Sequence, residues 1–197
     1  MRQPDGFAST HGAGHGFQPA PPARLVRLFV RQGLTETGPR ERATIQSVLD
    51  LIVGFPGVDV ITGAVALDAG SFKASHEAAA QSGFSPSAFR DRRLALLSSA
   101  HAMVVIRTGM SESTAFEIAY NIFGGARLPI FFAVHEQAAI KTTLLQELGA
   151  LVPTVYAPFG DPKDLRSGFS QFLDRIRSGL PAEATHGAGS SGLSQTS

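Results

Sequence analysis

The sequence predicts a single three-layer α/β domain built around a parallel sheet of five strands. Short apolar runs alternate with longer segments of helical periodicity, which is typical of β-α-β units with helices on both faces of a sheet. The 197 residues, 43% of them hydrophobic, suffice for one well-buried core but not for two large domains. The pattern fits a Rossmann-like fold with the flavodoxin-like strand order 2-1-3-4-5, although the sequence does not determine the order.

Each predicted strand is a short segment rich in Val, Ile, Leu or Phe, bounded by polar residues or by Gly and Pro. The five predicted strands cover residues 24–31, 58–67, 101–107, 129–134 and 152–156.

Helices are predicted between these strands. The first begins at Pro39, and Gly54 ends it. Its apolar residues lie at i, i+3, i+4, i+7 and i+8, and they are Ile45, Val48, Leu49, Ile52 and Val53. A short helix is expected around residues 73–81, and longer ones over residues 85–99 and 114–123.

Two further helices are predicted in the C-terminal part of the chain. One follows the fourth strand and ends at Gly149, a residue type that favours helix C-termini. The other is amphipathic, and its predicted buried residues are Leu165, Phe169, Phe172, Leu173 and Ile176.

Composition limits the possible functions. Residues 1–22 and 181–197 are rich in Gly, Pro, Ser and Ala and are predicted to be disordered tails around a domain of residues 23–180. The net charge of +1 does not favour binding to polymeric nucleic acid or to a membrane, and no apolar run approaches the ~20 residues of a membrane span. The N-terminus lacks the apolar core of a signal peptide, and a cytoplasmic location is expected.

Metal and cofactor chemistry has little support in the sequence. The chain has no cysteine, which excludes disulfides and thiolate ligands, and no His/Asp/Glu cluster has the spacing of metal ligands. No Gly-x-Gly-x-x-Gly motif follows the first strand, so a dinucleotide cofactor is not expected. We predict neither a metal nor a cofactor.

Polar residues follow the predicted strands. Arg31 and Gly33 end the first strand, Arg107 and Gly109 end the third, and His135 ends the fourth. Because ligands bind at the carboxyl edge of such sheets, two Arg and a His there favour an anionic ligand such as a phosphate or carboxylate. The alternative is that these residues are polar only because strand ends meet water.

The turn of residues 108–114 joins the third strand to a helix. A helix N-terminus binds anions through free N–H groups, and Ser111, Ser113 and Thr114 add hydroxyl donors. A structural alternative is a capping box, in which Thr114 caps the helix and Glu117 reaches back to it.

Residues 90–93 contain Arg90, Asp91, Arg92 and Arg93, and they are interpreted as a solvated helix face without a role in the site.

Residues 101–120 resemble the nucleoside 2-deoxyribosyltransferase family and its relatives that hydrolyse nucleotide N-glycosidic bonds. The similarity consists of an apolar strand, a Gly/Ser turn and the sequence Thr-Ala-Phe-Glu-Ile-Ala-Tyr, residues 114–120, at a helix start. The resemblance implies that Glu117 is a nucleophile that forms a covalent glycosyl-enzyme while the base leaves. It also implies a small-molecule nucleoside or nucleotide as the partner and a homo-oligomer, to which the apolar residues 120–123 would contribute unless they belong to the core.

The sequence departs from the family pattern at the residue that assists the leaving base. The transferases usually carry an Asp in this turn, where Ser111 and Glu112 stand here, so Glu112 is the candidate substitute. The hydrolases often have an Asp that opens the third strand, where this chain has His101, a second candidate proton donor.

In the hydrolases that act on monophosphates, Ser side chains of this turn and helix N–H groups hold the phosphate. Ser111 and Ser113 suit that role, and with Arg31 and Arg107 they favour a nucleotide over a free nucleoside.

The predicted function is therefore cleavage or transfer at the N-glycosidic bond of a nucleoside or nucleoside 5′-monophosphate. The alternatives are a non-catalytic nucleotide-binding or sensing domain, because fold alone does not determine function, and an interaction protein acting through its tails. The base, the 2′ position of the sugar, and the choice between water and a second base as acceptor are left open by the sequence.

Overall fold

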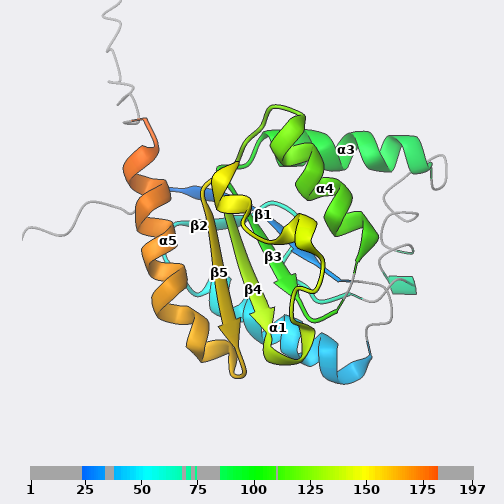
Figure 1. The fold of residues 1–197 in the computed structure, drawn as a ribbon, viewed down its shortest axis with the longest axis vertical. Helices are drawn as coiled ribbons and strands as arrows, with labels where there is room; N and C mark the ends of the chain where they lie inside the picture. Colours follow the sequence, from blue (N-terminus) through cyan, green and yellow to red (C-terminus); the bar gives the residue numbers. More distant parts are fainter. Residues whose placement is uncertain are drawn as a thin grey trace, which may run out of the picture.

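The computed structural model describes residues 24–33, 38–67, 70–71, 74, 85–109 and 111–181. They form a parallel sheet of five strands in the order β2-β1-β3-β4-β5, with helices on both faces (Figure 1). The predicted fold class and strand order are confirmed. The two predicted tails, apart from residue 181, and most of the predicted helix around residues 73–81 lie outside the described residues.

The strands differ from the prediction mainly at the two edges of the sheet. They are β1 (Val26–Gln32), β2 (Val58–Val60), β3 (Ala102–Arg107), β4 (Ile130–His135) and β5 (Thr154–Phe159).

The second strand is much shorter than the predicted 58–67. Thr62 Oγ1 donates to the carbonyl of Val30 and accepts from its N–H, at 2.9 and 3.0 Å. A side chain therefore occupies the β1 backbone groups that a longer β2 would have paired with.

The last strand is longer than the predicted 152–156. It continues through Pro158, and in the described part of the chain it pairs with β4 alone, which makes it an edge strand. Proline is tolerated there because an edge strand leaves N–H positions that need no partner in the sheet.

In the described part of the chain, two helices cover each face of the sheet. Helices α1 (Pro39–Val53) and α5 (Leu165–Gly179) pack on one face, and α3 (Pro86–Ser98) and α4 (Glu112–Phe123) pack on the other. Successive strand residues alternate between the two cores: Leu28 and Val30 face α1 and α5, whereas Phe29 faces α3 and α4. All five core residues predicted for the last helix are buried.

The first helix matches its predicted limits but not its whole predicted face. Val53 is 45% exposed, and Leu51 is buried in its place. The helix ends at this point, so its last residue no longer faces the sheet.

The predicted helix that ends at Gly149 is wrong. The chain between β4 and β5 forms three short 3-10 helices, η1 (Glu136–Ala138), η2 (Thr143–Leu145) and η3 (Leu148–Ala150). A fourth, η4 (Pro162–Asp164), precedes α5.

Side chains satisfy the backbone where the helix was expected. Arg107 Nε donates to the carbonyl of Ala138 at 2.8 Å, and the Tyr156 hydroxyl donates to the carbonyl of Leu145 and accepts from Leu148 N–H. The Tyr156 ring also stacks on Phe132, with centroids 5.0 Å apart, so it covers this part of the sheet.

None of the helices described is long and apolar enough to cross a membrane.

Candidate functional site

Helix α4 begins two residues before the predicted start. Ser111 is its N-cap, with extended backbone angles, and its Oγ accepts from Thr114 N–H at 3.4 Å. Thr114 is thus the third residue of the helix, and Glu117 lies in the second turn. The predicted capping box between Thr114 and Glu117 is wrong, because Ser111 already caps the helix.

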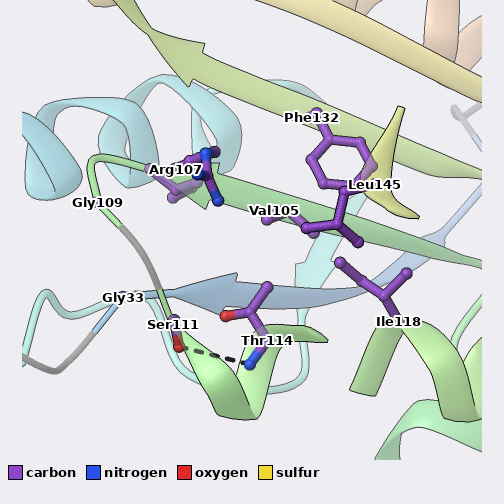
Figure 2. Close-up of a pocket in the computed structure, with 10 residues that line it drawn as sticks. Gly33, Val105, Arg107, Gly109, Ser111, Thr114, Ile118, Phe132 and Leu145 are labelled. Atoms are coloured by element: carbon purple, nitrogen blue, oxygen red, sulfur yellow. Dashed lines mark hydrogen bonds between the residues drawn. The ribbon is translucent and has the colours of Figure 1, made fainter. Parts of the chain in front are cut away.

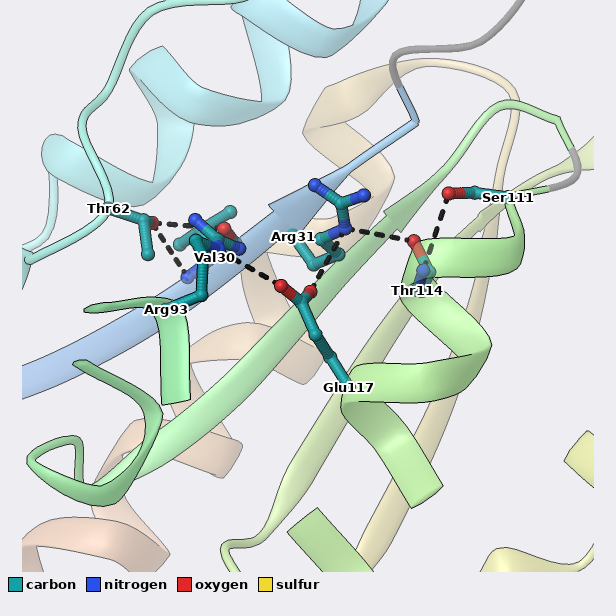
Figure 3. Close-up of polar contacts among 7 residues, drawn as sticks. All are labelled: Val30, Arg31, Thr62, Arg93, Ser111, Thr114 and Glu117. Carbon is teal, nitrogen blue, oxygen red and sulfur yellow. Dashed lines mark hydrogen bonds and ion pairs between the residues drawn. The ribbon is translucent and has the colours of Figure 1, made fainter. Parts of the chain in front are cut away.

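The Glu117 side chain turns toward the sheet instead of back to the helix start. It is only 6% exposed, and it lies between two arginines from different elements (Figure 3). Arg93 Nε of α3 donates to Oε1 at 2.9 Å, and Arg31 Nε of β1 lies 3.0 Å from Oε2. A buried carboxylate needs such partners to offset the loss of hydration, so this Arg-Glu-Arg triad holds Glu117 in place.

The two oxygens of Glu117 are not equivalent. The single N–H of Arg31 Nε is directed at Thr114 Oγ1, 3.2 Å away, so its contact with Oε2 is an ion pair without hydrogen-bond alignment. Within the described residues, Oε2 accepts no hydrogen bond. Oε2 is therefore a buried oxygen that has Arg31 as an ion-pair partner and keeps its lone pairs free of hydrogen bonds from the described residues.

Arg31 is itself buried, with 5% of its surface exposed. Burial lowers the pKa of Arg31, Glu117 opposes that change by its negative charge, and the nearby Arg93 adds to the lowering. Arg31 lies at the carboxyl end of the first strand, as predicted. Its Nε, however, faces the carboxylate of Glu117 and not a ligand.

The solvated interpretation of the arginine cluster is wrong for Arg93. Its side chain is 9% exposed, and its guanidinium lies over the ring of Phe29, 4.4 Å from the centroid. Its Nη2 is buried and has no hydrogen-bond partner in the described part of the chain. Helical periodicity is the signal that was available, because Arg93 precedes the fully buried Leu97 by four residues.

The rest of that cluster agrees with the prediction. Arg90 and Asp91 form an exposed ion pair at 3.0 Å, and Arg92 is exposed.

A narrow pocket adjoins the triad at the carboxyl edge of the sheet (Figure 2). It has room for about one water molecule. Glu117 is not among its lining residues, which are Gly33, Val105, Ile106, Arg107, Gly109, Ser111, Thr114, Ile118, Phe132 and Leu145. The structure therefore brings five of the predicted binding residues to one pocket, and Arg31 contacts it through Thr114.

Arg107 and His135 mainly hold the chain after β4. Arg107 donates to the carbonyls of Ala138 and Ala139, and burial lowers its pKa. His135 Nδ1 accepts from Gln137 N–H at the start of η1. Both lie at the predicted edge, but in this structure neither side chain contacts the triad.

His101 lies at the opposite edge of the sheet. Its Nδ1 accepts from Arg27 N–H at 3.1 Å, before the start of β3. Arg31, the partner of Glu117, is in register with Val105, four residues further along, or roughly 13 Å at the rise of a β-strand. This position does not fit the predicted role of His101 as a proton donor at the site.

Glu112 and Ser113 stand at the start of α4 and are exposed to solvent. In the part of the chain that the structure describes, no three His, Asp or Glu side chains converge on a point where they could hold a metal ion.

The cap at Ser111 gives a stability prediction. Ser111→Ala removes the side chain that accepts from Thr114 N–H, and it is expected to lower the free energy of unfolding by about 1 kcal/mol. Urea unfolding followed by circular dichroism measures this. Ser113→Ala, two residues further along and exposed, is the control, and an equal loss in both variants would argue against capping by Ser111.

These features define an α/β protein of the Rossmann-like class whose carboxyl edge carries a buried carboxylate between two arginines. No protein-family model matches the chain, and no curated protein matches it. Among solved structures, a CMP N-glycosidase of Clostridium botulinum, BcmB, is similar with a TM-score of 0.49 and 13% sequence identity, over 74% of this chain and 98% of that one. The similarity is distant.

Proposed function

We propose that this protein cleaves the N-glycosidic bond of a nucleoside or nucleoside 5′-monophosphate, with Glu117 as the nucleophile. The observation that carries the proposal is the buried Glu117 carboxylate, held by Arg93 through Oε1 while Oε2 accepts no hydrogen bond within the described residues. A carboxylate in this state can stabilise an oxocarbenium-like transition state and then bond to it. The sequence resemblance at residues 114–120 assigns the same residue.

The proposed reaction has two steps. Glu117 Oε2 bonds to the anomeric carbon of the sugar as the bond from that carbon to the base nitrogen breaks, and the base leaves with the electron pair and takes up a proton. Water or a second base then attacks the anomeric carbon as its bond to Oε2 breaks, and the attacking molecule loses a proton to solvent, which frees the carboxylate. Glu112, exposed at the first residue of α4, is the proposed source of the proton for the leaving base.

The surroundings of Glu117 support a substrate with a phosphate group. Ser111 and Thr114 line a pocket at the N-terminus of α4, where helix N–H groups attract anions. Gly33 and Gly109 line it without side chains, and among the described residues, their chain neighbours apart, no atom lies within 4 Å of where their Cβ atoms would be.

Base release from a panel of nucleosides, deoxynucleosides and their 5′-monophosphates, followed by chromatography, tests the proposal. We expect release from at least one monophosphate with the wild-type protein and none with Glu117→Ala. If the two proteins release base equally, Glu117 is not the nucleophile, and if the wild type releases none, the activity is absent.

A non-catalytic nucleotide-binding domain is the second candidate. It is favoured by the burial of Glu117, which does not line the pocket, and by the location of His101 at the other edge of the sheet. Calorimetric binding of a monophosphate without turnover would support this candidate, whereas measured turnover would exclude it.

A further inference from the structure

Arg31 uses only part of its guanidinium group within the protein. Nε contacts Glu117 Oε2 and donates to Thr114 Oγ1, on one edge of the group. The two Nη groups point away from the carboxylate (Figure 3), and neither donates a hydrogen bond to any residue in the described part of the chain. Although the Arg31 side chain as a whole is buried, neither Nη is among the fully buried side-chain atoms that lack a partner, so both reach solvent and can meet a ligand.

The chemistry around these donors favours a phosphate monoester. A planar guanidinium binds phosphate oxygens through two parallel N–H donors, which Nη1 and Nη2 supply. Thr114, which accepts from Arg31, is also in the first turn of α4 and lines the pocket beside Ser111. The positive end of the α4 dipole and the Arg31 charge therefore act on the same small volume.

Arg31 thus has an anion on one edge and, on the other, two Nη groups without a hydrogen-bond partner among the described residues. We propose that the phosphate of the substrate and the Glu117 carboxylate share Arg31, so that phosphate binding weakens the hold of Arg31 on Glu117 Oε2 and activates the nucleophile. The inference rests on the proposed function and deepens it, because it makes the phosphate an activator as well as a means of binding.

The activation follows from the charges. In the free protein, Oε2 gains stabilisation from a full positive charge 3.0 Å away. A dianionic phosphate on the Nη edge neutralises much of that charge, so Arg31 stabilises the carboxylate less before the reaction. The carboxylate therefore loses less electrostatic stabilisation when Oε2 bonds to the sugar, which lowers the barrier. A nucleoside without phosphate leaves Glu117 paired with the full charge of Arg31 and reacts more slowly even when bound.

Binding of inorganic phosphate tests the sharing without any turnover. Linked sites are coupled reciprocally, typically by a factor of 5–150, so removal of the competing carboxylate in Glu117→Gln is expected to tighten phosphate binding about ten-fold in isothermal titration calorimetry. Arg31→Gln is expected to lose this binding. Equal or weaker binding of phosphate to Glu117→Gln than to the wild type overturns the proposal, as does the absence of phosphate binding from both.

Arg27→Gln is the matched control. Arg27 lies on the same strand and the same face as Arg31, four residues earlier, and its partners are the exposed Asp59 at 4.0 Å and Ser99 Oγ at 3.3 Å. We expect phosphate to bind Arg27→Gln and the wild type with the same affinity. Equal weakening in Arg27→Gln and Arg31→Gln would mean that general positive charge, and not a shared Arg31, attracts phosphate.

A substrate supplied in two pieces tests the activation itself. Free nucleoside is offered with and without inorganic phosphite, which occupies a phosphate subsite without a link to the sugar. We expect phosphite to raise the kcat for base release at least ten-fold in the wild type and not at all in Arg31→Gln.

Different results would overturn the glycosidase function and the sharing of Arg31. Base release from a monophosphate without any activation by phosphite would leave the glycosidase function standing and overturn the sharing of Arg31. No base release from any substrate would overturn the function, while the phosphate titration of Glu117→Gln would still decide whether the two anions compete.

Discussion

Glu117→Gln is expected to lower the rate of base release by at least ~10³-fold, or about 4 kcal/mol of transition-state stabilisation. The amide has nearly the same shape as the carboxylate, and it can still accept from Arg93 Nε through its oxygen. It cannot form the glycosyl ester that carries the reaction. Single-turnover measurements with a monophosphate would measure the loss separately from binding.

Asp174→Asn is the matched control for this prediction. Asp174 is an exposed carboxylate on α5, on the face of the sheet opposite α4, and it pairs with Arg177 three residues later. We expect its rate to equal that of the wild type. A rate for Glu117→Gln within ten-fold of the wild-type rate would contradict the assignment of the nucleophile.

Arg93→Met is expected to lower the free energy of unfolding by roughly 3 kcal/mol, because it removes one partner of a buried ion pair. Met keeps an apolar chain over the ring of Phe29 but leaves Glu117 Oε1 without its donor. Urea unfolding at neutral pH measures the change.

Arg90→Met on the same helix is the control for this loss. The Arg90 side chain is 55% exposed, and its contact with Asp91 is a surface pair, so its substitution is expected to change stability by less than about 0.5 kcal/mol. Similar losses in both variants would show that helix α3, and not the triad, is responsible.

The order of the elements was predictable because it depends on apolar periodicity. The last helix shows this best, since Leu165, Phe169 and Ile176 recur at helical spacing and all three are buried. The segment between β4 and β5 was not predictable by the same means. Its backbone is held by the distant side chains of Arg107 and Tyr156, and a local pattern carries no information on such contacts.

The location of the site at the carboxyl edge of the sheet was predictable, but the ion pairs of Glu117 with Arg31 and Arg93 were not. Arg31 and Glu117 are both read from the sequence as residues of the carboxyl edge, 86 positions apart, and the structure joins them at 3.0 Å. Arg93 was missed because three charged neighbours made α3 resemble a solvated surface, although its spacing from Leu97 places it on the buried face, where it pairs with Glu117 of α4.

The edges of the sheet bear on how copies of this chain can associate. Pro158 leaves β5 without one N–H, and β2 at the other edge has only three residues, so neither edge offers a long row of free backbone donors and acceptors. Extension of the sheet from one copy into the next is therefore disfavoured. Helical surfaces are an alternative for the predicted homo-oligomer, and on α4 Phe116 and Phe123 are exposed seven residues apart.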